Sequence, residues 1–153
     1  MTAQESATPF RDDIHEALMN LLAHDPSYEA VAVIENERVQ SVFSKTAQVV
    51  DLATRRSEQD RLSSELTLWL PCFRHIYQSS LGLEGQGEGL KFCIRLPSKQ
   101  GALHTLGQSF GEGSYVVMIL SETTHVERAR FYLNQTSRAV ERVYRSSVAL
   151  RLT

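Results

Sequence analysis

The residues best suited to chemistry in this sequence are Cys72 and His75, which stand three positions apart. On a helix this spacing places both side chains on one face, where a thiolate and an imidazole can bind one metal ion. A zinc site needs about four ligands, and nothing obvious in the sequence supplies the others unless a second copy of the chain does. The pair could also form a thiol nucleophile with its base, but no carboxylate follows to orient the histidine. We therefore expect no metal, no cofactor and no catalytic residue, and ordinary packing or surface placement for this pair.

A glycine-rich loop spans residues 82–89, with the sequence Gly-Leu-Glu-Gly-Gln-Gly-Glu-Gly. Loops that bind phosphate run from a strand into a helix and usually carry Lys and Ser or Thr. This loop runs from an expected helix into an expected strand, and it carries Glu84 and Glu88. A flexible connector is the better interpretation.

Three arginines, Arg55, Arg56 and Arg61, cluster where a long helix is expected to start, and Arg74 follows further along it. A run of charge is normally a solvated face. Interfaces favour arginine, however, so a face that docks a partner protein remains an alternative. The histidines are scattered along the sequence, and we expect surface or capping positions for most of them, at positions 15, 24, 75, 104 and 125.

The composition is that of one soluble domain. The chain has 153 residues, of which 42% are hydrophobic and 22% charged, values that are ordinary for a globular protein. A net charge of −2 lacks the basic surplus expected of a nucleic-acid-binding protein. No apolar run reaches the ~20 residues that a membrane span needs. The polar start lacks the apolar core of a signal peptide, and two cysteines do not make a disulfide framework. We expect a cytoplasmic protein without nucleic-acid binding or membrane insertion.

Hydrophobic periodicity predicts three helices and five strands in the order α-β-β-α-β-β-β-α. The expected elements are a helix from Pro9 to the stop at Asp25-Pro26, strands at 30–35 and 38–44, a connection at 45–56, a helix capped by Ser57, strands at 90–96, 102–110 and 114–120, and a helix opened at Val126 by a Thr124–Glu127 capping box. We expect a disordered lead at 1–8, one domain over 9–146 and a frayed tail at 147–153.

The strands at 30–35 and 114–120 are apolar on both faces, which predicts neighbouring positions in the middle of a covered sheet. The strands at 38–44 and 90–96 belong nearer the edges. The first and last helices would then share one face of the sheet, and the middle helix would cover the other. This is an α+β domain of three layers around one antiparallel, five-stranded sheet.

The middle helix carries more apolar surface than one buried face requires, and Pro71 inside it predicts a kink. Its main stripe is made of Leu62, Leu66, Trp69, Phe73, Ile76 and Tyr77, with Leu68 and Leu70 partly off it. The following strand alternates with Leu90, Phe92, Ile94 and Leu96 inward and Lys91, Cys93 and Arg95 outward. A helix that is covered twice beside a good edge strand indicates a partner, because free strand edges are either protected or paired.

The order and length of these elements resemble the Roadblock (dynein light-chain type) domain, which is profilin-like in fold. Two segments carry the resemblance: AVAVIENERV at 30–39, similar to the first hairpin of the family, and GEGSYVVMIL at 111–120, similar to its apolar strand before the final helix. The resemblance covers roughly residues 10–146 and is a pattern of elements and apolar positions.

The resemblance implies a homodimer or heterodimer in which two sheets join through their third strands and the middle helices pack side by side. The implied interface is Leu90, Lys91, Phe92, Cys93, Ile94, Arg95 and Leu96, with Trp69, Phe73 and Tyr77 buried against the second copy. Family members are non-enzymatic platforms for small Ras-like GTPases and scaffold proteins, and bacterial members, including a gliding-motility regulator, can speed GTP hydrolysis by a partner GTPase. On this basis the partner-binding residues to test are Arg55, Arg56, Arg61 and Arg74.

Two features depart from the family pattern, namely Pro71 and the long stretch at 45–56, and both fall near the implied partner surface. A small-ligand sensor of profilin-like shape is the alternative function. It would need a pocket between the middle helix and the sheet, where the bulky stripe fills the space. An enzyme ranks third, because no acid–base pair, metal set or nucleophile arrangement rises above chance.

Overall fold

The structure is a computed structural model that describes residues 2–45, 52–81, 89–98 and 101–152, with side chains described over 12–45, 56–81, 89–98 and 101–146. The elements follow the predicted order. They are α1 (Thr2–Ala23), β1 (Tyr28–Glu35), β2 (Arg38–Ser44), α2 (Leu52–Ser80), β3 (Lys91–Ser98), β4 (Gly101–Gly111), β5 (Ser114–Leu120) and α3 (Val126–Leu152).

The five strands form one antiparallel sheet in the order β2-β1-β5-β4-β3. Every residue of β5 is buried, and β1 is buried over most of its length. These two strands pair directly along the centre of the sheet. The prediction that the doubly apolar segments are central neighbours, with β2 and β3 at the edges, is confirmed.

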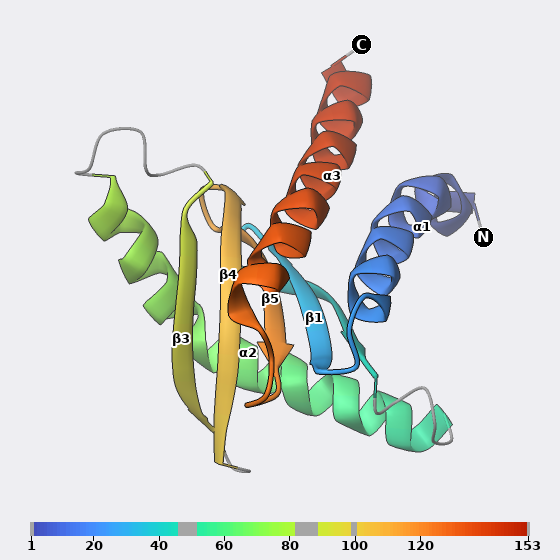
Figure 1. Ribbon diagram of the computed structural model, residues 1–153. Coiled ribbons are helices and arrows are strands. Elements are labelled where there is room, and N and C mark those ends of the chain that lie inside the picture. Colours follow the sequence, from blue (N-terminus) through green and yellow to red (C-terminus); the bar gives the residue numbers. More distant parts are fainter. Residues whose placement is uncertain (1, 46–51, 82–88, 99–100, 153) are drawn as a thin grey trace.

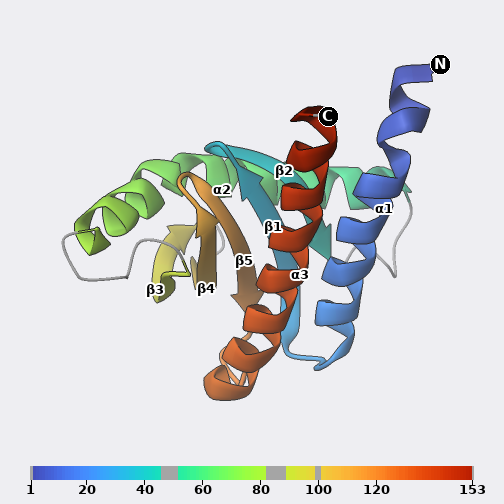
Figure 2. The ribbon, with the colours of Figure 1, turned by 90° about the horizontal axis from the view of Figure 1, so that it is seen from above.

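Helices cover both faces of the sheet. Figures 1 and 2 show α1 and α3 on one face and α2 along the other. Successive residues of β1 accordingly enter different cores: Val31 and Val33 pack beneath α1 and α3, whereas Ala32 and Ile34 pack beneath α2. The fold is therefore the α+β arrangement in three layers that the sequence predicts.

Three helix ends differ from the prediction. α1 begins at Thr2, so the segment expected to be a disordered lead is helical from that residue onward. α2 begins at Leu52, within the expected connection and ahead of the expected cap Ser57, and α3 continues to Leu152. Good helix formers such as Ala, Gln, Glu and Arg dominate these extensions, and a serine does not interrupt a helix that is already running. The domain extent of 9–146 stays a prediction, and 46–51 lie outside the described residues.

The start of α3 lies at Val126 as predicted, but its cap is a different residue. The backbone N–H of Arg128 donates to Nδ1 of His125 at 3.3 Å. The hydroxyl of Thr124, the expected cap, donates instead to the carbonyl of Ser27 at 3.2 Å. Thr124 therefore ties the entry of α3 to the segment before β1, and a histidine takes the capping role.

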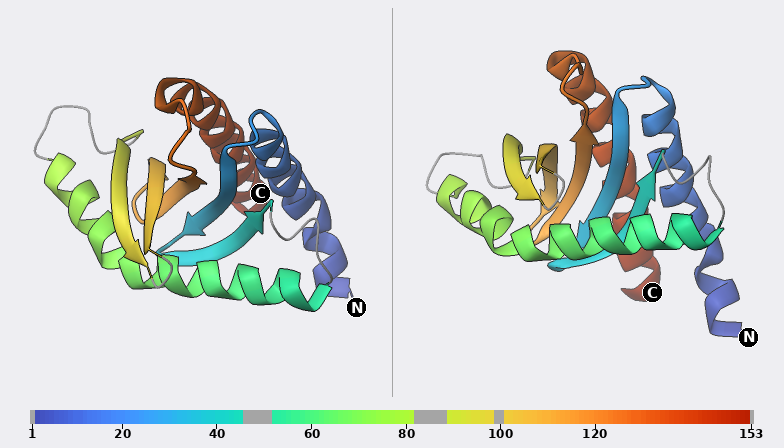
Figure 3. Two further views of the ribbon diagram at one scale, coloured as in Figure 1. Left: turned by 60° about the horizontal axis from the view of Figure 1, so that its bottom comes forward. Right: turned by 90° about the horizontal axis from the view of Figure 1, so that it is seen from below.

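α2 carries Pro71 inside the helix. Figure 3 shows that α2 changes direction along its length as it crosses the sheet. A proline lacks the N–H that would bond to the carbonyl of Thr67, and its ring displaces that carbonyl, which bends a helix. The expected kink thus lets the long helix follow the twisted sheet.

A glycine makes room for an aromatic ring between β3 and β4. Gly107 is the cross-strand partner of Phe92, and a Cβ on Gly107 would lie 2.2 Å from the ζ carbon of that ring. The Phe92 ring in turn contacts the rings of Phe73, at a centroid distance of 5.2 Å, and Tyr115, at 6.1 Å. Glycine is thus required at position 107 by the packing of the core under α2.

Replacement of this glycine tests the packing. We expect Gly107→Ala to lower the free energy of unfolding by about 1–3 kcal/mol, because the new methyl group overpacks the site. Gly111→Ala is the matched control, since its Cβ would meet only the Cβ of Ser114 at 3.9 Å. Urea denaturation measures both. Equal losses in the free energy of unfolding for the two substitutions would contradict this packing. It would also be contradicted if Phe92→Leu, added to Gly107→Ala, restored none of the lost stability.

A second prediction concerns Tyr115, whose side chain is 1% exposed and whose hydroxyl has no hydrogen-bond partner in the described part of the chain. Burial raises the pKa of Tyr115 to about 12, with a further contribution from the charge of Glu37. Above pH ~10 an unfolded tyrosine loses its proton while the folded one retains it. Deprotonation therefore lowers the free energy of the unfolded state relative to the folded state. The free energy of unfolding falls as the pH rises from about 10 to about 12.

We expect Tyr115→Phe to leave stability unchanged or slightly raised at pH 7, because the lost hydroxyl has no partner to forfeit. Between pH 10 and 12 the variant becomes more stable than the parent by about 2 kcal/mol. Unfolding midpoints in urea across that pH range measure the difference. A constant gap between variant and parent over the whole range would exclude this role for Tyr115.

Candidate partner surface

One side of β3 is a free strand edge. β3 pairs with β4 from Lys91 to Ser98, and no other strand of the described residues pairs with its far side. The N–H of Ser109 donates to the carbonyl of Leu90 at 2.8 Å. Because hydrogen bonding alternates along an antiparallel strand, Phe92, Ile94 and Leu96 also bond toward β4. The N–H and C=O groups of Lys91, Cys93 and Arg95 then point outward.

Pro97 fits this reading of the edge. The strand runs through it to Ser98, beyond the predicted strand end at Leu96. By the same alternation the nitrogen of Pro97 faces outward, where no ladder bond is lost, and proline in a strand is confined to such edge positions. Three consecutive outward positions before it remain open to another strand.

The side chains of β3 alternate as the sequence predicts. Phe92 and Leu96 are buried beneath α2, with Leu90 and Ile94 half-buried at its rim. Lys91, Cys93 and Arg95 are exposed on the opposite side, the side of α1 and α3. α3 lies over β4 and β5, so no helix of the described residues covers the outer side of β3 (Figure 1).

A half-buried stripe of α2 lies next to this edge. Its members are Trp69, Cys72 and Ile76, and the buried Glu65 continues it one turn toward the start of the helix. Glu65 accepts a hydrogen bond from the hydroxyl of Ser98 at 2.7 Å, which places this side of α2 against β3. Trp69 and Ile76 pack at the margin of the same core as Leu90 and Ile94. We call β3 together with Trp69, Cys72 and Ile76 the edge surface.

Phe73 and Tyr77 do not belong to the edge surface, which corrects the sequence-based interface. Phe73 is fully buried within its own subunit, and its ring packs against those of Phe92 and Tyr115. Tyr77 is 8% exposed. Of the main apolar stripe of α2, Leu62, Leu66, Phe73 and Tyr77 are buried within their own subunit, and Trp69 and Ile76 remain half-buried. Leu68, at 75% exposure the most exposed large hydrophobic residue described, takes the place of Phe73 and Tyr77 as apolar surface on the helix.

Arg61 and Arg74 lie far apart along α2 and pair with different carboxylates. Arg61 bridges Glu58 at 2.6 Å and Glu65 at 2.9 Å, and hydrogen bonding to Glu58 raises its pKa. Arg74 bridges Glu37 in the β1–β2 turn at 2.5 Å, and that bond raises the pKa of Arg74. Arg56 is exposed, and the side chain of Arg55 lies outside the described residues. Two of the four charges are therefore already matched within the subunit.

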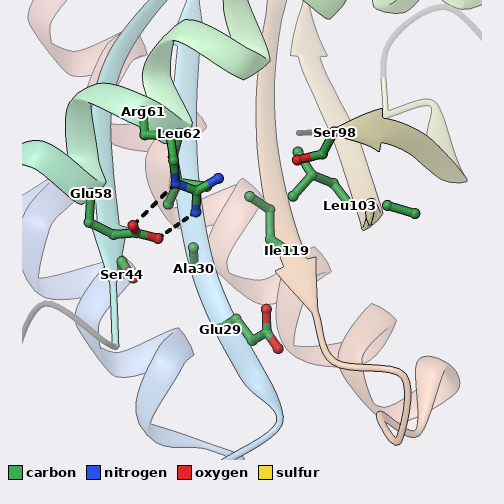
Figure 4. A pocket seen from close by; sticks show the side chains of 10 residues that line it. Glu29, Ala30, Ser44, Glu58, Arg61, Leu62, Ser98, Leu103 and Ile119 are labelled. Carbon is green, nitrogen blue, oxygen red and sulfur yellow. Dashed lines mark hydrogen bonds and ion pairs between the residues drawn. The ribbon is translucent and has the colours of Figure 1, made fainter. Parts of the chain in front are cut away.

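A pocket of about 150 Å³ lies between the first half of α2 and the sheet (Figure 4). Its lining is Glu29, Ala30, Ser44, Glu58, Arg61, Leu62, Ser98, Ala102, Leu103 and Ile119. Sequence analysis missed it because these residues come from segments far apart in the chain. Sites for small organic ligands usually measure about 300–1,000 Å³, so this pocket suits waters or a small ion and gives little support to the sensor alternative.

Among the residues that the structure describes, no further metal ligands join Cys72 and His75. Cys72 is half-buried and His75 is exposed, and the described residues hold no cluster of three or more groups able to bind a metal ion. His15 packs edge-on against Phe43, and His24 stacks on Tyr132 at 3.8 Å. Residues 82–88 of the glycine-rich loop lie outside the described residues.

A different cysteine and histidine do meet. Sγ of Cys93 on β3 lies 3.6 Å from Nε2 of His104 on β4. Sequence analysis did not find this pair, because eleven positions separate the two residues and only the register of β3 on β4 brings them together. The signal available was that both segments were expected to be strands of one sheet.

Solved structures of other proteins have a similar fold. No protein-family model and no curated protein matches the sequence. Among solved structures, the gliding protein MglB from Thermus thermophilus is similar, with a TM-score of 0.60 and 12% identity over 86% of this chain and 88% of that one. MglC from Myxococcus xanthus follows, with a TM-score of 0.52, 14% identity, and 84% and 97% of the two chains covered.

A Roadblock/LC7 domain from Streptomyces avermitilis is similar to the same degree, with a TM-score of 0.52 and 13% identity over 81% of this chain and 91% of that one. No helix in the described ranges combines the length and the hydropathy that a membrane crossing requires. The order of the elements, the order of the strands and these likenesses agree. The chain has the fold of the Roadblock/LC7 domain.

Proposed function

We propose that this protein is a non-enzymatic, cytoplasmic module that forms a homodimer through its edge surface and binds and regulates a small Ras-like GTPase. The observation that carries the proposal is the free edge of β3 beside a half-buried apolar stripe of α2. Both features are incomplete in one subunit, and a second copy placed edge to edge completes both.

The energetics favour such a dimer. Pairing of two β3 edges satisfies the outward N–H and C=O groups and buries the exposed parts of Trp69, Ile76, Leu90 and Ile94 at the same time. An interface of standard size buries about 1,600 Å² in total. At about 25 cal/mol per Å² of apolar area, the free energy of burial exceeds the cost of the lost translational and rotational freedom, so association is favourable.

The GTPase part of the proposal rests on likeness. The sequence resembles a family whose members act as platforms for small Ras-like GTPases, and the fold is similar to that of MglB and MglC. Of the four arginines named for partner binding, Arg61 and Arg74 are already held by carboxylates, so neither is a free arginine finger. Stimulation of hydrolysis would therefore act by ordering the residues of the GTPase itself. Leu68, exposed on α2, supplies the apolar contact point.

The dimer is tested by removing one outward N–H. We expect Arg95→Pro to convert the dimer into a folded monomer, because proline at an outward position leaves the β3–β4 ladder intact but cannot donate to a second strand. Arg95→Ala is the control, since it removes the same charge and keeps the N–H. Sedimentation at tens of micromolar, roughly an ordinary assay concentration, distinguishes the two variants. A parent protein that is a strict monomer refutes the proposal, and so does an Arg95→Pro protein that still dimerises.

The GTPase contact is tested by titrating the protein into a Ras-like GTPase from the same organism, loaded with GDP or with a non-hydrolysable GTP analogue. We expect binding that depends on the nucleotide and that weakens roughly tenfold or more in Leu68→Glu, because a buried apolar contact is replaced by a charge. Phe131→Glu is the matched control, since Phe131 is 60% exposed on α3, on the other face of the sheet. Equal losses for the two variants would place the contact elsewhere, and no binding to any such GTPase would remove this part of the proposal.

A further inference from the structure

The contact between Cys93 and His104 lies on the uncovered side of β3. The thiol is exposed, and its sulfur lies 3.6 Å from Nε2 of the imidazole, within the range of a hydrogen bond that involves sulfur. Cys93 also holds one of the three outward positions of the free edge, between Lys91 and Arg95. The more accessible of the two cysteines is thus placed in the middle of the strand on which edge pairing depends.

The other ring nitrogen of His104 decides how the pair is protonated. Nδ1 is buried and has no hydrogen-bond partner among the described residues. With the proton on Nε2, the buried nitrogen carries only a lone pair, and Nε2–H donates to the sulfur. The opposite tautomer would bury an N–H group with no acceptor. Buried N–H groups without a partner are rarer in proteins than buried acceptors without a partner. The Nε2–H group then faces the sulfur from 3.6 Å, a position from which it can orient the thiol for attack.

The surroundings of Cys93 are cationic. Lys91 and Arg95 lie two positions away on the same strand and therefore share its face. Arg95 is near enough for the cysteine charge to contribute to its raised pKa, after the larger effects of Glu122. Glu122 pairs with Arg95 at 2.8 Å, whereas Lys91 makes no ion pair with any described residue. Exposure, a donor to sulfur and neighbouring positive charge are the features that distinguish reactive thiols from inert ones.

We propose that Cys93 is a modification site that forms a mixed disulfide with a small anionic disulfide of the glutathione type. The thiol releases its proton to solvent, and the thiolate attacks one sulfur of the disulfide. A bond forms between Sγ and that sulfur while the original S–S bond breaks, and the other half leaves as a thiolate with the electron pair. Cys93 is oxidised and the departing half is reduced. Lys91 and Arg95 attract the carboxylates of the reagent.

Modification and edge pairing exclude each other, a consequence that rests on the proposed homodimer. The adduct is a bulky charged peptide on the side chain of Cys93, on the α1 and α3 side of β3. It lies beside the backbone groups that a second strand would bond and crowds the strand of a second copy. Conversely, pairing of the edges shields the sulfur from attack. The site therefore makes dimer formation sensitive to the thiol–disulfide balance around the protein.

Single-cysteine proteins test the site. Cys72→Ser leaves only Cys93, and Cys93→Ser leaves only the half-buried Cys72 of α2 as the matched control. Each is treated with glutathione disulfide or with the cationic disulfide cystamine, and adduct formation is followed by intact-protein mass spectrometry. Each rate is divided by the rate for the same protein unfolded in urea, which removes the intrinsic reactivity of the reagent.

We expect the normalised rate with glutathione disulfide to be roughly tenfold or more higher for Cys93 than for Cys72. His104→Leu in the Cys72→Ser background slows both reagents several-fold. Lys91→Gln slows glutathione disulfide but not cystamine, which separates charge attraction from activation. Equal normalised rates at the two cysteines overturn the proposal, and so does a Cys93 rate that His104→Leu leaves unchanged in a protein with native circular dichroism.

Sedimentation of the modified protein tests the consequence separately. We expect the glutathione adduct of the Cys72→Ser protein to be a monomer, and removal of the adduct with dithiothreitol to restore the dimer of the same protein. An adduct that still dimerises refutes the blocking step. If the untreated protein is itself a monomer, the homodimer fails, but the reaction rates still confirm or refute the thiol site.

Discussion

The structure depends on the burial of β1 and β5 on both faces. Because both faces of these strands are apolar, the alternation of polar and apolar residues that normally sets strand register gives little information here. Val31, Val33, Val116, Met118 and Leu120 lie beneath α1 and α3. On the other face Ala30 and Ala32 lie beneath α2 together with the larger Ile34, Tyr115, Val117 and Ile119. Phe73 of α2 packs its ring against those of Phe92 on β3 and Tyr115 on β5.

The same arrangement explains why the edge surface exists. On the face opposite α2 the sheet carries α1 and α3, and α3 packs over β4 and β5. Among the described residues, the outer strand β3 is therefore covered on the α2 side and not on the other, which is why its residues alternate between buried and exposed (Figure 1). The free backbone edge, the half-buried rim of α2 and the exposed Cys93 all follow from this incomplete cover. A surface proposed for a partner and a site proposed for modification thus have one structural cause.

The sequence could predict what depends on local pattern. The apolar runs identified the central strands, and the alternation at 90–96 predicted correctly which side of β3 is buried. The sequence could not predict the helix ends. Good helix formers precede Ser57, and no local signal starts α2 at Ser57 instead of at Leu52. The wide apolar stripe of α2 could not show whether a partner or the same chain buries its outer residues. Phe73 proved to be buried by the sheet of its own chain. The contact of Cys93 with His104 depends on a register across two strands that no single segment contains.

Charge on the edge limits how strongly two copies can pair. In a two-fold antiparallel pairing centred on Cys93, Lys91 of each copy would lie opposite Arg95 of the other, and like charges directly opposite each other destabilise a sheet. Edge strands often carry such charges as protection against uncontrolled pairing. Here Glu122 pairs with Arg95 and offsets one of the two charges, so the repulsion is reduced and not abolished. Pairing then depends on the apolar rim formed by Trp69, Ile76 and Ile94, which an unrelated strand edge lacks. In the proposed dimer, this combination would favour a second copy of the chain over other strands and would keep the association reversible, as the proposed control by Cys93 requires.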